Sequence, residues 1–268
     1  MSLFKSYQED AVMVQASALY WTNTTWVKGD KTLLICDPNW LPDEIDAILA
    51  AILPLVKTHR IYYLFTHADY DHIIGYGAMP PGQVVTSHDM AHLINRENAL
   101  DQVRRWDGQH YIQRHYEHRF PVADLTVTND GQQLQLGEFN VTCFLAAGHT
   151  ADGAMYFIRE TGTLLLGDYL SALEFPFIED SWYAYVRTLD KVADTVIDLD
   201  WTLAIPGHGP CYESYQDLWD RLQADQGYLQ RLNVKSQAAD WEKIYPFAGF
   251  LANEHRRNER KYQAENKT

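Results

Sequence analysis

The sequence contains few cysteines, and their pattern does not favour disulfides. Cys36, Cys143 and Cys211 are an odd number of thiols at wide spacing, whereas a disulfide framework uses an even number at short intervals. Cys36 and Cys143 lie within apolar, strand-like runs, where cysteine behaves as a small hydrophobic residue. Cys211 follows the segment PGHGP closely, so a thiol near a functional site is left open for that residue.

Basic residues are scarce relative to acidic ones. The chain has 22 Lys and Arg against 36 Asp and Glu, which gives a formal net charge of −14 at pH 7. A surface of this charge repels phosphate backbones and anionic lipid headgroups unless a local basic patch overcomes the average. We therefore expect neither a nucleic-acid partner nor a membrane partner.

Long apolar runs are absent as well. No stretch approaches the roughly 20 apolar residues that a membrane-spanning helix needs. The first ten residues, MSLFKSYQED, lack the apolar stretch of a signal peptide. We therefore expect a cytoplasmic protein, and the sequence leaves its oligomeric state open.

The remaining composition is typical of a globular protein. Hydrophobic residues make up 46% of the sequence and charged residues 22%, which leaves ample material for a buried core. We find no low-complexity linker and no short-period repeat. We expect a single domain over residues 1–268, with a helical C-terminal region that begins at about residue 213.

The spacing of apolar residues predicts an alternation of strands and helices. Strands are predicted within residues 11–36, 61–66, 83–87, 154–160, 163–168 and 202–206, and two hairpins after Leu125, with turns at Asn129-Asp130-Gly131 and Gly137. Helices are predicted at 43–58, where Pro54 should kink or shorten the helix, at 89–106 with a continuation to Arg119, at 181–199 and at 213–235. The tail after Asn253 is predicted as a helix or a frayed end. Two sheets packed face to face, with helices on the outside, satisfy this order.

Four of the apolar runs end directly in residues that can bind metals. IYYLFT ends in His67, VTCFLAA in Gly148-His149, TLLLG in Asp168, and TLAIP in Gly207-His208. If these strands lie side by side, their ends converge at one edge and bring four distant segments into one cleft. A single His or Asp after a strand is usually part of a turn or a cap, but four such strand ends together favour a common site.

The first of these segments, HADYDH, supplies four potential ligands in six residues: His67, Asp69, Asp71 and His72. If the backbone is extended, residues 67, 69 and 71 point to the same side. Imidazole and carboxylate groups suit zinc, iron and manganese. The alternative is a solvated turn whose Asp residues cap a following helix, and the density of ligands in this segment argues against it.

These motifs resemble those of the metallo-β-lactamase superfamily. Its signature is a His-x-His-x-Asp-His loop followed by Gly-His-Thr, a strand-ending Asp and a late Gly-His, and the order and spacing agree from about Leu33 to Pro210. The resemblance implies an α+β fold, a four-layer αββα sandwich with a binuclear metal site at one edge. It also implies that His67 and His149 bind the first metal, that Asp168 bridges the two metals, and that the second metal is bound by Asp71, His72 and His208.

Asp69 departs from the signature, because most hydrolytic members of the superfamily have their second His at this position. An added carboxylate lowers the net positive charge of the metal pair and shifts the ligand set toward oxygen donors, so iron or manganese gains plausibility. The flavodiiron proteins of the same superfamily have a Glu at the position of Asp69, in a di-iron site. Asp69 resembles this Glu with a side chain that is one methylene shorter. Asp69 is expected to coordinate a metal directly or through water.

The resemblance implies a metal-dependent hydrolase with two divalent metal ions, zinc, iron or manganese, as cofactors. A metal-bound hydroxide would attack a small-molecule substrate: an ester, thioester, lactone, amide or phosphodiester. Asp71 is the candidate catalytic residue, since it can orient the hydroxide and hold a proton for the leaving group.

Two other functions stay open. One is a non-haem di-iron oxidoreductase related to flavodiiron proteins, which Asp69 favours; the flavodoxin-like domain of those proteins has no counterpart in this sequence, which counts against it. The other is a binding protein with a catalytically weakened metal site, against which the seven candidate ligands argue.

Three further groups of residues could have functional roles, but a structural role is favoured for each. His110, His115 and His118 are expected to be ordinary exposed or core histidines. The basic cluster Arg256, Arg257, Arg260 and Lys261 could bind an anionic group but is expected to be a solvated helical face. Five aromatic residues near the site loops could line a pocket but are expected to close the core: Trp40, Tyr169, Phe175, Phe177 and Tyr183.

Overall fold

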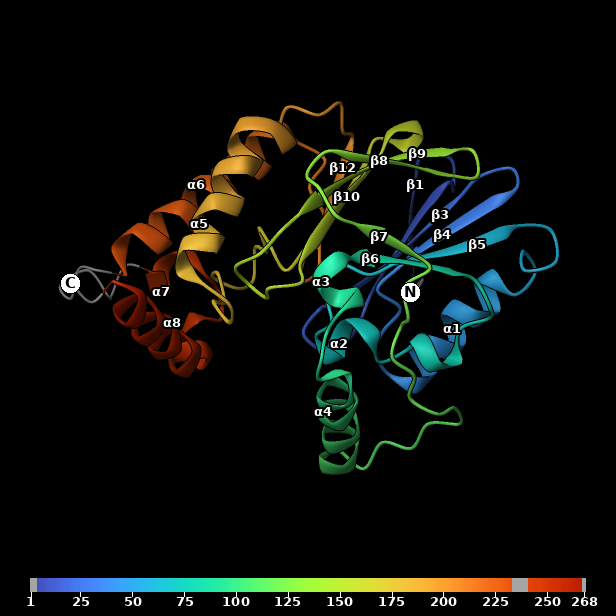
Figure 1. Ribbon diagram of the computed structural model, residues 1–268, viewed down its shortest axis with the longest axis horizontal. Coiled ribbons are helices and arrows are strands. Elements are labelled where there is room, and N and C mark those ends of the chain that lie inside the picture. Colours follow the sequence, from blue (N-terminus) through green and yellow to red (C-terminus); the bar gives the residue numbers. More distant parts are fainter. Residues whose placement is uncertain (1–3, 233–240, 267–268) are drawn as a thin grey trace.

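A computed structural model describes residues 4–232 and 241–266 of the chain. In Figure 1, two sheets lie face to face between two groups of helices, with α1 and α2 beside the first sheet and α5 to α8 beside the second. The predicted four-layer αββα sandwich is therefore confirmed.

The first sheet has seven strands in the order of the sequence. They are β1 (Phe4–Tyr7), β2 (Val12–Ala16), β3 (Asn23–Lys28), β4 (Thr32–Cys36), β5 (Arg60–Leu64), β6 (Gln83–Ser87) and β7 (Leu125–Val127). Strands β1 to β4 pair antiparallel, and β4 to β7 pair parallel.

The second sheet has five strands in the order β12-β11-β10-β9-β8. They are β8 (Gln132–Leu136), β9 (Phe139–Leu145), β10 (Ala154–Ile158), β11 (Thr163–Gly167) and β12 (Leu203–Pro206). Strands β8 to β11 pair antiparallel, and β12 joins β11 in parallel.

The described helices cover the outer faces of both sheets. The α-helices are α1 (Pro42–Ile52), α2 (Tyr70–Ile73), α3 (His88–Ala91), α4 (Arg96–Gln109), α5 (Trp182–Lys191), α6 (Tyr215–Arg231), α7 (Trp241–Ile244) and α8 (Ala252–Glu265). Short 3-10 helices form at Tyr76–Ala78, Arg159–Thr161 and Ala248–Leu251, and a π-helical turn, Val192–Val196, extends α5. Within residues 4–232 and 241–266, no helix has both the length and the apolar character needed to cross a membrane.

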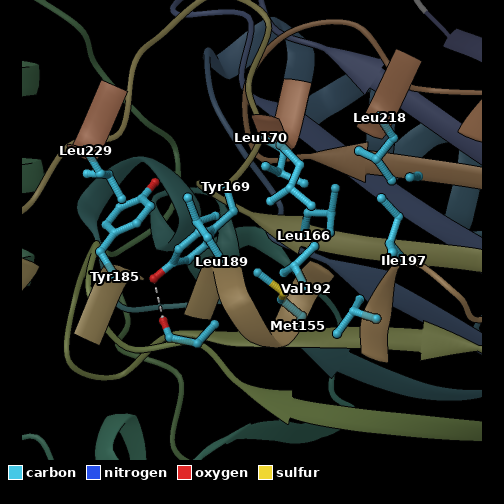
Figure 2. Packing of buried hydrophobic residues seen from close by; sticks show 14 of the residues in the cluster. Met155, Leu166, Tyr169, Leu170, Tyr185, Leu189, Val192, Ile197, Leu218 and Leu229 are labelled. Atoms are coloured by element: carbon cyan, nitrogen blue, oxygen red, sulfur yellow. Dashed lines mark hydrogen bonds between the residues drawn. The ribbon is translucent and has the colours of Figure 1, made fainter. Parts of the chain in front are cut away.

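The apolar runs in the sequence are continuous because both faces of the central strands are buried. In β4, Leu34 faces the layer between the sheets, while Leu33 and Ile35 face the layer under α1. In β11, Leu165 faces the layer between the sheets, whereas Leu166 faces the helices on the other side. Figure 2 shows part of this outer layer, in which Leu166 and Met155 pack with side chains of α5 and α6. Because successive side chains of β4 and β11 point to opposite faces, each sheet packs into apolar layers on both sides, and the fold has three such layers.

Two predicted helices have different bounds. Helix α1 ends at Ile52 instead of residue 58, because Pro54 has no N–H to donate to the carbonyl one turn earlier. The helix predicted from residue 89 is two helices, and Ser87 caps the first by accepting a hydrogen bond from the N–H of Met90 (3.0 Å). The second begins at Arg96 after a turn.

Two connections also differ from the prediction. Residues 110–119 do not continue the helix, because Arg114 binds the carboxylate of Asp107 (2.7 and 2.9 Å) and the carbonyl of Trp40 (2.7 Å) and so holds an irregular loop. The turn Asn129-Asp130-Gly131 does not close a hairpin, because β7 belongs to the first sheet and β8 to the second. The hairpin at Gly137 is confirmed between β8 and β9. The long helix predicted at 213–235 corresponds to α6, which runs from Tyr215 to Arg231. Residues 233–240 of the sequence lie outside the described residues.

We predict that Tyr156→Phe lowers the free energy of unfolding by about 1–2 kcal/mol, because it removes a buried hydrogen bond between the sheets. Tyr156 of β10 is fully buried and donates its hydroxyl to the carbonyl of Phe65, which follows β5 (2.8 Å). Urea unfolding measures the change. Tyr111→Phe is the matched control, since Tyr111 is 93% exposed; an equal effect of both substitutions would contradict the role assigned to Tyr156.

Candidate metal centre

The seven predicted ligands meet at one edge of the sandwich. The first sheet supplies four of them through the segment after β5, and the second sheet supplies three from the ends of β9, β11 and β12. The four strands therefore belong to two different sheets of the predicted sandwich. Their ends converge because the two sheets face each other across the apolar layer.

The segment HADYDH is not extended throughout. Asp69 has extended dihedral angles and precedes α2, so Asp71 and His72 lie on the first turn of that helix. The predicted alternation of 67, 69 and 71 along an extended backbone is thus wrong for Asp71. The helical turn still directs Asp71 and His72 into the cluster, because their ligand atoms lie within 4.8 Å of that of His208.

A first group of donor atoms comprises His67, Asp69 and His149. Asp69 Oδ2 lies 3.6 Å from His67 Nε2 and 3.3 Å from His149 Nε2. Asp168 Oδ2 lies 3.7 Å and 3.3 Å from the same two nitrogens. A tetrahedral ion with bonds of about 2.1 Å separates its ligand atoms by about 3.4 Å. The spacing of this group therefore fits a single small cation.

A second group comprises Asp71, His72 and His208. Asp71 Oδ2 lies 3.4 Å from His208 Nε2 and 3.8 Å from His72 Nε2. Asp168 reaches this group as well, with Oδ1 3.0 Å from His72 Nε2 and Oδ2 3.3 Å from His208 Nε2. Asp168 thus faces both groups and stands where a bridging carboxylate would.

The other ring nitrogen of each histidine is held by an acceptor. His149 Nδ1 lies 3.0 Å from the carbonyl oxygen of Phe177, and His208 Nδ1 lies 2.9 Å from that of Tyr20. A carbonyl oxygen can only accept, so Nδ1 carries the hydrogen in both rings. In the neutral ring, Nε2 then presents a lone pair to the cluster.

Asp37 fixes the remaining two rings in the same way. Its Oδ2 accepts from His72 Nδ1 (3.0 Å) and from the hydroxyl of Thr66 (2.6 Å). Because the single hydroxyl hydrogen of Thr66 goes to Asp37, the hydroxyl oxygen accepts from His67 Nδ1 (3.0 Å). All four imidazoles therefore turn Nε2 inward, which is the arrangement that metal-binding histidines adopt.

Several of the inward atoms lack hydrogen-bond partners. The Nε2 atoms of His67, His72 and His149 and Oδ1 of Asp168 are buried and form no hydrogen bond among the described residues, although carboxylate oxygens of Asp168 lie 3.7, 3.0 and 3.3 Å from the three nitrogens. Unpartnered buried polar atoms are costly, and a divalent cation would satisfy them. The donor set of four imidazoles and three carboxylates therefore fits metal ions.

Two glycines allow these groups to approach one another. Gly148 has φ +130°, and a Cβ there would lie 2.3 Å from Cα of Tyr185 in α5. A Cβ on Gly207 would lie 2.1 Å from Oδ1 of Asp168. The glycine before His149 and the glycine before His208 are thus required by the close packing of the site.

The charges of the cluster shift its pKa values. Burial opposes a charge on His72, His149 and His208, but Asp168 and the other carboxylates around each ring together outweigh burial and hold the pKa of each ring well above its ordinary value. Burial likewise opposes the charge of Asp69 and Asp168, but the surrounding imidazoles lower the pKa of both carboxyl groups. Without metal, the fold therefore favours imidazolium rings beside carboxylates.

Sequence reasoning missed several residues of the site. Asp37 was detectable, because the run TLLIC of β4 ends in it just as four other strands end in candidate ligands. Asp152, in the motif GHTAD, accepts from the N–H of Ala68 (2.9 Å) and ties the His149 loop to the His67 segment. Glu174 lines a small cavity together with His149, Asp168 and His208, and no pattern in the sequence marked it.

The other residues considered from the sequence lie outside the cluster. His118 pairs with Asp107 (3.1 Å), and His110 stacks on Trp106. Tyr169, Phe175 and Trp40 are buried, as expected for core residues, and Tyr183 is exposed. Phe175 and Phe177 also line the small cavity that contains His149, Asp168 and His208, so for these two the pocket-lining alternative holds as well. Cys36 and Cys143 are buried and unpaired, and Cys211 lines a groove that contains none of the seven candidate ligands.

A groove of about 380 Å³ leads to Asp69. It lies beside α3 and α4 and is bordered by carboxylate and amide groups and no Lys or Arg: Asp89, Asn95, Asn98, Gln102, Asp152, Glu179 and Asp180. A second groove, of about 440 Å³, contains Arg257, Arg260 and Lys261 of the basic cluster, with Glu179 at its edge. Of these two grooves, the first contains a candidate ligand, Asp69, whereas His149, Asp168 and His208 line the small cavity beside Glu174.

Comparison with known sequences finds distant relatives. No family model matches the chain. The chain is 24% identical over 220 residues to 2,4-dinitroanisole O-demethylase subunit alpha of a Nocardioides species, which covers 75% of this chain and 58% of that protein. It is 24% identical over 144 residues to a probable polyketide biosynthesis zinc-dependent hydrolase of Bacillus subtilis, which covers 53% of each. The chain therefore spans little more than half the length of these relatives.

Comparison with solved structures shows the fold. A sec-alkylsulfatase from a Pseudomonas species has a TM-score of 0.68 at 13% identity, over 86% of this chain and 42% of that one. A metallo-β-lactamase family protein from Thermus thermophilus has a TM-score of 0.61 at 17% identity, over 98% and 92%. The rubredoxin oxygen:oxidoreductase of Desulfovibrio gigas has a TM-score of 0.55 at 15% identity, over 85% and 62%.

The chain thus has the metallo-β-lactamase fold, and the resemblance inferred from the motifs is confirmed. Proteins with this fold include hydrolases and an oxidoreductase, so the fold alone does not decide the reaction.

We predict that the metal-free protein loses stability as the pH rises above about 6.5. The folded-state pKa values of His72, His149 and His208 are raised. Protonation therefore stabilises the fold below the ordinary histidine pKa, and this contribution disappears as the pH passes the folded-state values. The thermal unfolding temperature of EDTA-treated protein should fall from about pH 6.5 to 9, and zinc should reverse the fall.

His208→Gln should weaken this decline, whereas His110→Gln, a substitution at an exposed position, should leave it unchanged. A melting temperature that stays constant or rises over the same range would show that the carboxylates do not stabilise imidazolium rings.

Proposed function

We propose that the chain is a binuclear metal-dependent hydrolase of a small molecule. The observation that supports this most is the convergence of four imidazoles, each with Nδ1 held and Nε2 directed inward, on three carboxylates. His67, Asp69 and His149 would bind one divalent ion, Asp71, His72 and His208 a second, and Asp168 would bridge them. When bound, the ions would lower the pKa of water and polarise the oxygen of the scissile bond.

Asp71 has the position of the proton carrier. Its contacts with His72 and His208 both use Oδ2, which leaves Oδ1 to accept a proton from the attacking water and return it to the leaving group. The side chain is only 11% exposed, so bulk water has little access to this proton. Asp168, by contrast, is engaged with four imidazoles and is a poor proton acceptor.

The groove that leads to Asp69 is the proposed path of the substrate. Among the seven candidate ligands, Asp69 has the most exposed side chain, at 31%. The metal centre is therefore open to solvent at Asp69. A volume of about 380 Å³ suits a small molecule. Because the lining is acidic and three carboxylates already neutralise much of the metal charge, we propose an uncharged or cationic ester, thioester, lactone or amide. A phosphodiester carries a negative charge, so the lining favours one only where a cationic substituent balances that charge.

A di-iron oxidoreductase is the second candidate function. It is favoured by Asp69, which lies within 3.6 Å of the imidazole nitrogens of the first group and makes the set rich in oxygen donors. The structural similarity to a rubredoxin oxygen:oxidoreductase points the same way. Redox-active iron in the purified protein, without hydrolysis, would select this function, and a protein that binds metal but catalyses neither reaction would be a weakened relative.

We predict that Asp71→Ala lowers hydrolytic turnover at least about 100-fold with little effect on folding, because it removes the proton carrier. Zinc-, manganese- and iron-loaded protein would be assayed on a panel of the five substrate classes, with uncharged and anionic forms of the ester, thioester, lactone and amide, and anionic and zwitterionic phosphodiesters. Asp198→Ala, at an exposed position, is the control. Parental turnover in Asp71→Ala would refute the role of Asp71, and a panel that shows no hydrolysis at all would refute the hydrolase.

We further predict that Asp69→His shifts metal preference toward zinc, because imidazole replaces a hard oxygen donor. Metal-free protein would be equilibrated with equal concentrations of Zn²⁺ and Mn²⁺, and bound metal measured by mass spectrometry. Asp89→His introduces a histidine into the same groove outside the cluster and serves as the control. An unchanged zinc-to-manganese ratio in Asp69→His would show that Asp69 is not a ligand.

A further inference from the structure

Residues 176–180 hold His149 through both its ring and its backbone. The carbonyl of Phe177 accepts from His149 Nδ1 (3.0 Å). The N–H groups of Glu179 and Asp180 donate to the carbonyl of His149 (2.9 and 3.0 Å). The position of this segment therefore decides where His149 Nε2 points.

Asn258 of α8 binds this segment on both sides of Phe177. Its Oδ1 accepts from the N–H of Ile178 (2.9 Å), and its Nδ2 donates to the carbonyl of Pro176 (2.6 Å). Nδ2 also donates to the hydroxyl of Tyr228 (2.9 Å). Asn258 is 2% exposed, so water cannot replace these bonds without opening the packing around it.

The two bonds to the backbone constrain the peptide units on either side of Phe177. A carbonyl between two fixed peptide units has little freedom to rotate, so Asn258 fixes the acceptor that orients His149. Helix α8 lies outside the part of the chain that carries the metal-binding motifs, which ends near Pro210. The helical C-terminal region thereby reaches the centre through one buried amide.

The second group of candidate ligands is held by other elements. His208 is oriented by the carbonyl of Tyr20, between β2 and β3, and His72 by Asp37 at the end of β4. The side chain of Asn258 bonds to Ile178, Pro176 and Tyr228, and not to Tyr20 or Asp37. Loss of Asn258 should therefore disturb the first group and spare the second.

We propose that Asn258 is a positioning residue for the metal ion bound by His67, Asp69 and His149. This inference rests on the proposed two-metal centre, but it does not depend on which reaction the centre catalyses.

The test compares zinc binding by the full-length protein and four variants. Asn258→Ala removes both bonds to the segment. Asn258→Asp retains an acceptor for Ile178 but places a carboxylate against the carbonyl of Pro176. Tyr228→Phe removes the neighbouring hydroxyl, with its bonds to Asn258 and to His255 Nδ1 (2.9 Å), and leaves the segment bound. Asn253→Ala makes the same substitution at an exposed position of α8.

Competition with a chromophoric chelator would give the two successive zinc dissociation constants, and thermal unfolding of the metal-free proteins would give their stability. In Asn258→Ala and Asn258→Asp, we expect one constant to weaken about 10- to 100-fold, as for other residues that orient metal ligands, and the other to change less than about twofold. Tyr228→Phe should lower the unfolding temperature while both constants stay parental. Asn253→Ala should change neither.

Parental zinc constants in Asn258→Asp, or an equal weakening of one constant in Tyr228→Phe, would overturn the proposal, because the effect would then be absent or merely structural. Equal weakening of both constants in the Asn258 variants would overturn it too. Should Asn258→Ala fail to fold, Asn258→Asp decides. A wild-type protein that binds no zinc, iron or manganese would refute the metal centre itself, whereas binding without hydrolysis would refute only the proposed reaction.

Discussion

The hydrogen bonds to the Nδ1 atoms of four histidines are the constraint on which the site depends. Backbone carbonyls hold His149 and His208, and the carboxylate of Asp37 holds His72 directly and His67 through Thr66. Each bond fixes both the tautomer and the direction of a ring. Because all four Nε2 atoms are thereby aimed at Asp168, the chain concentrates lone pairs and carboxylates in a volume that only cations or protons can neutralise.

The layered fold makes this constraint possible. Apolar side chains on both faces of β4, β5 and β11 fix the sheets against each other and against the helices, so the ends of strands from two sheets meet at one edge. The hydroxyl of Tyr156 joins the sheets just before His67. Small residues then bring the donors together, since Gly148 and Gly207 occupy positions where a side chain would collide with Tyr185 or Asp168.

The sequence predicted the sandwich from the order of its apolar runs. It predicted that the seven donors meet because His and Asp residues directly follow several of these runs, a pattern that can be seen in the sequence without the structure. It could have predicted Asp37 by the same rule. It could not predict the carbonyls of Phe177 and Tyr20, because every residue has a carbonyl, nor Asn258, whose role depends on the packing of α8. The turn at 129–131 was misassigned because a turn signal does not say which sheet the next strand joins, and the loop at 110–119 because Arg114 is anchored by tertiary contacts.

The central claim is that the seven side chains hold two cations between them. Crystals of metal-loaded protein, measured at the absorption edge of the bound metal, test it most directly through an anomalous difference map. The account predicts two peaks, each about 2.0–2.3 Å from the donors of one group, with Asp168 in contact with both. A map without peaks in this cluster, or with its peaks on another face of the protein, would contradict the account.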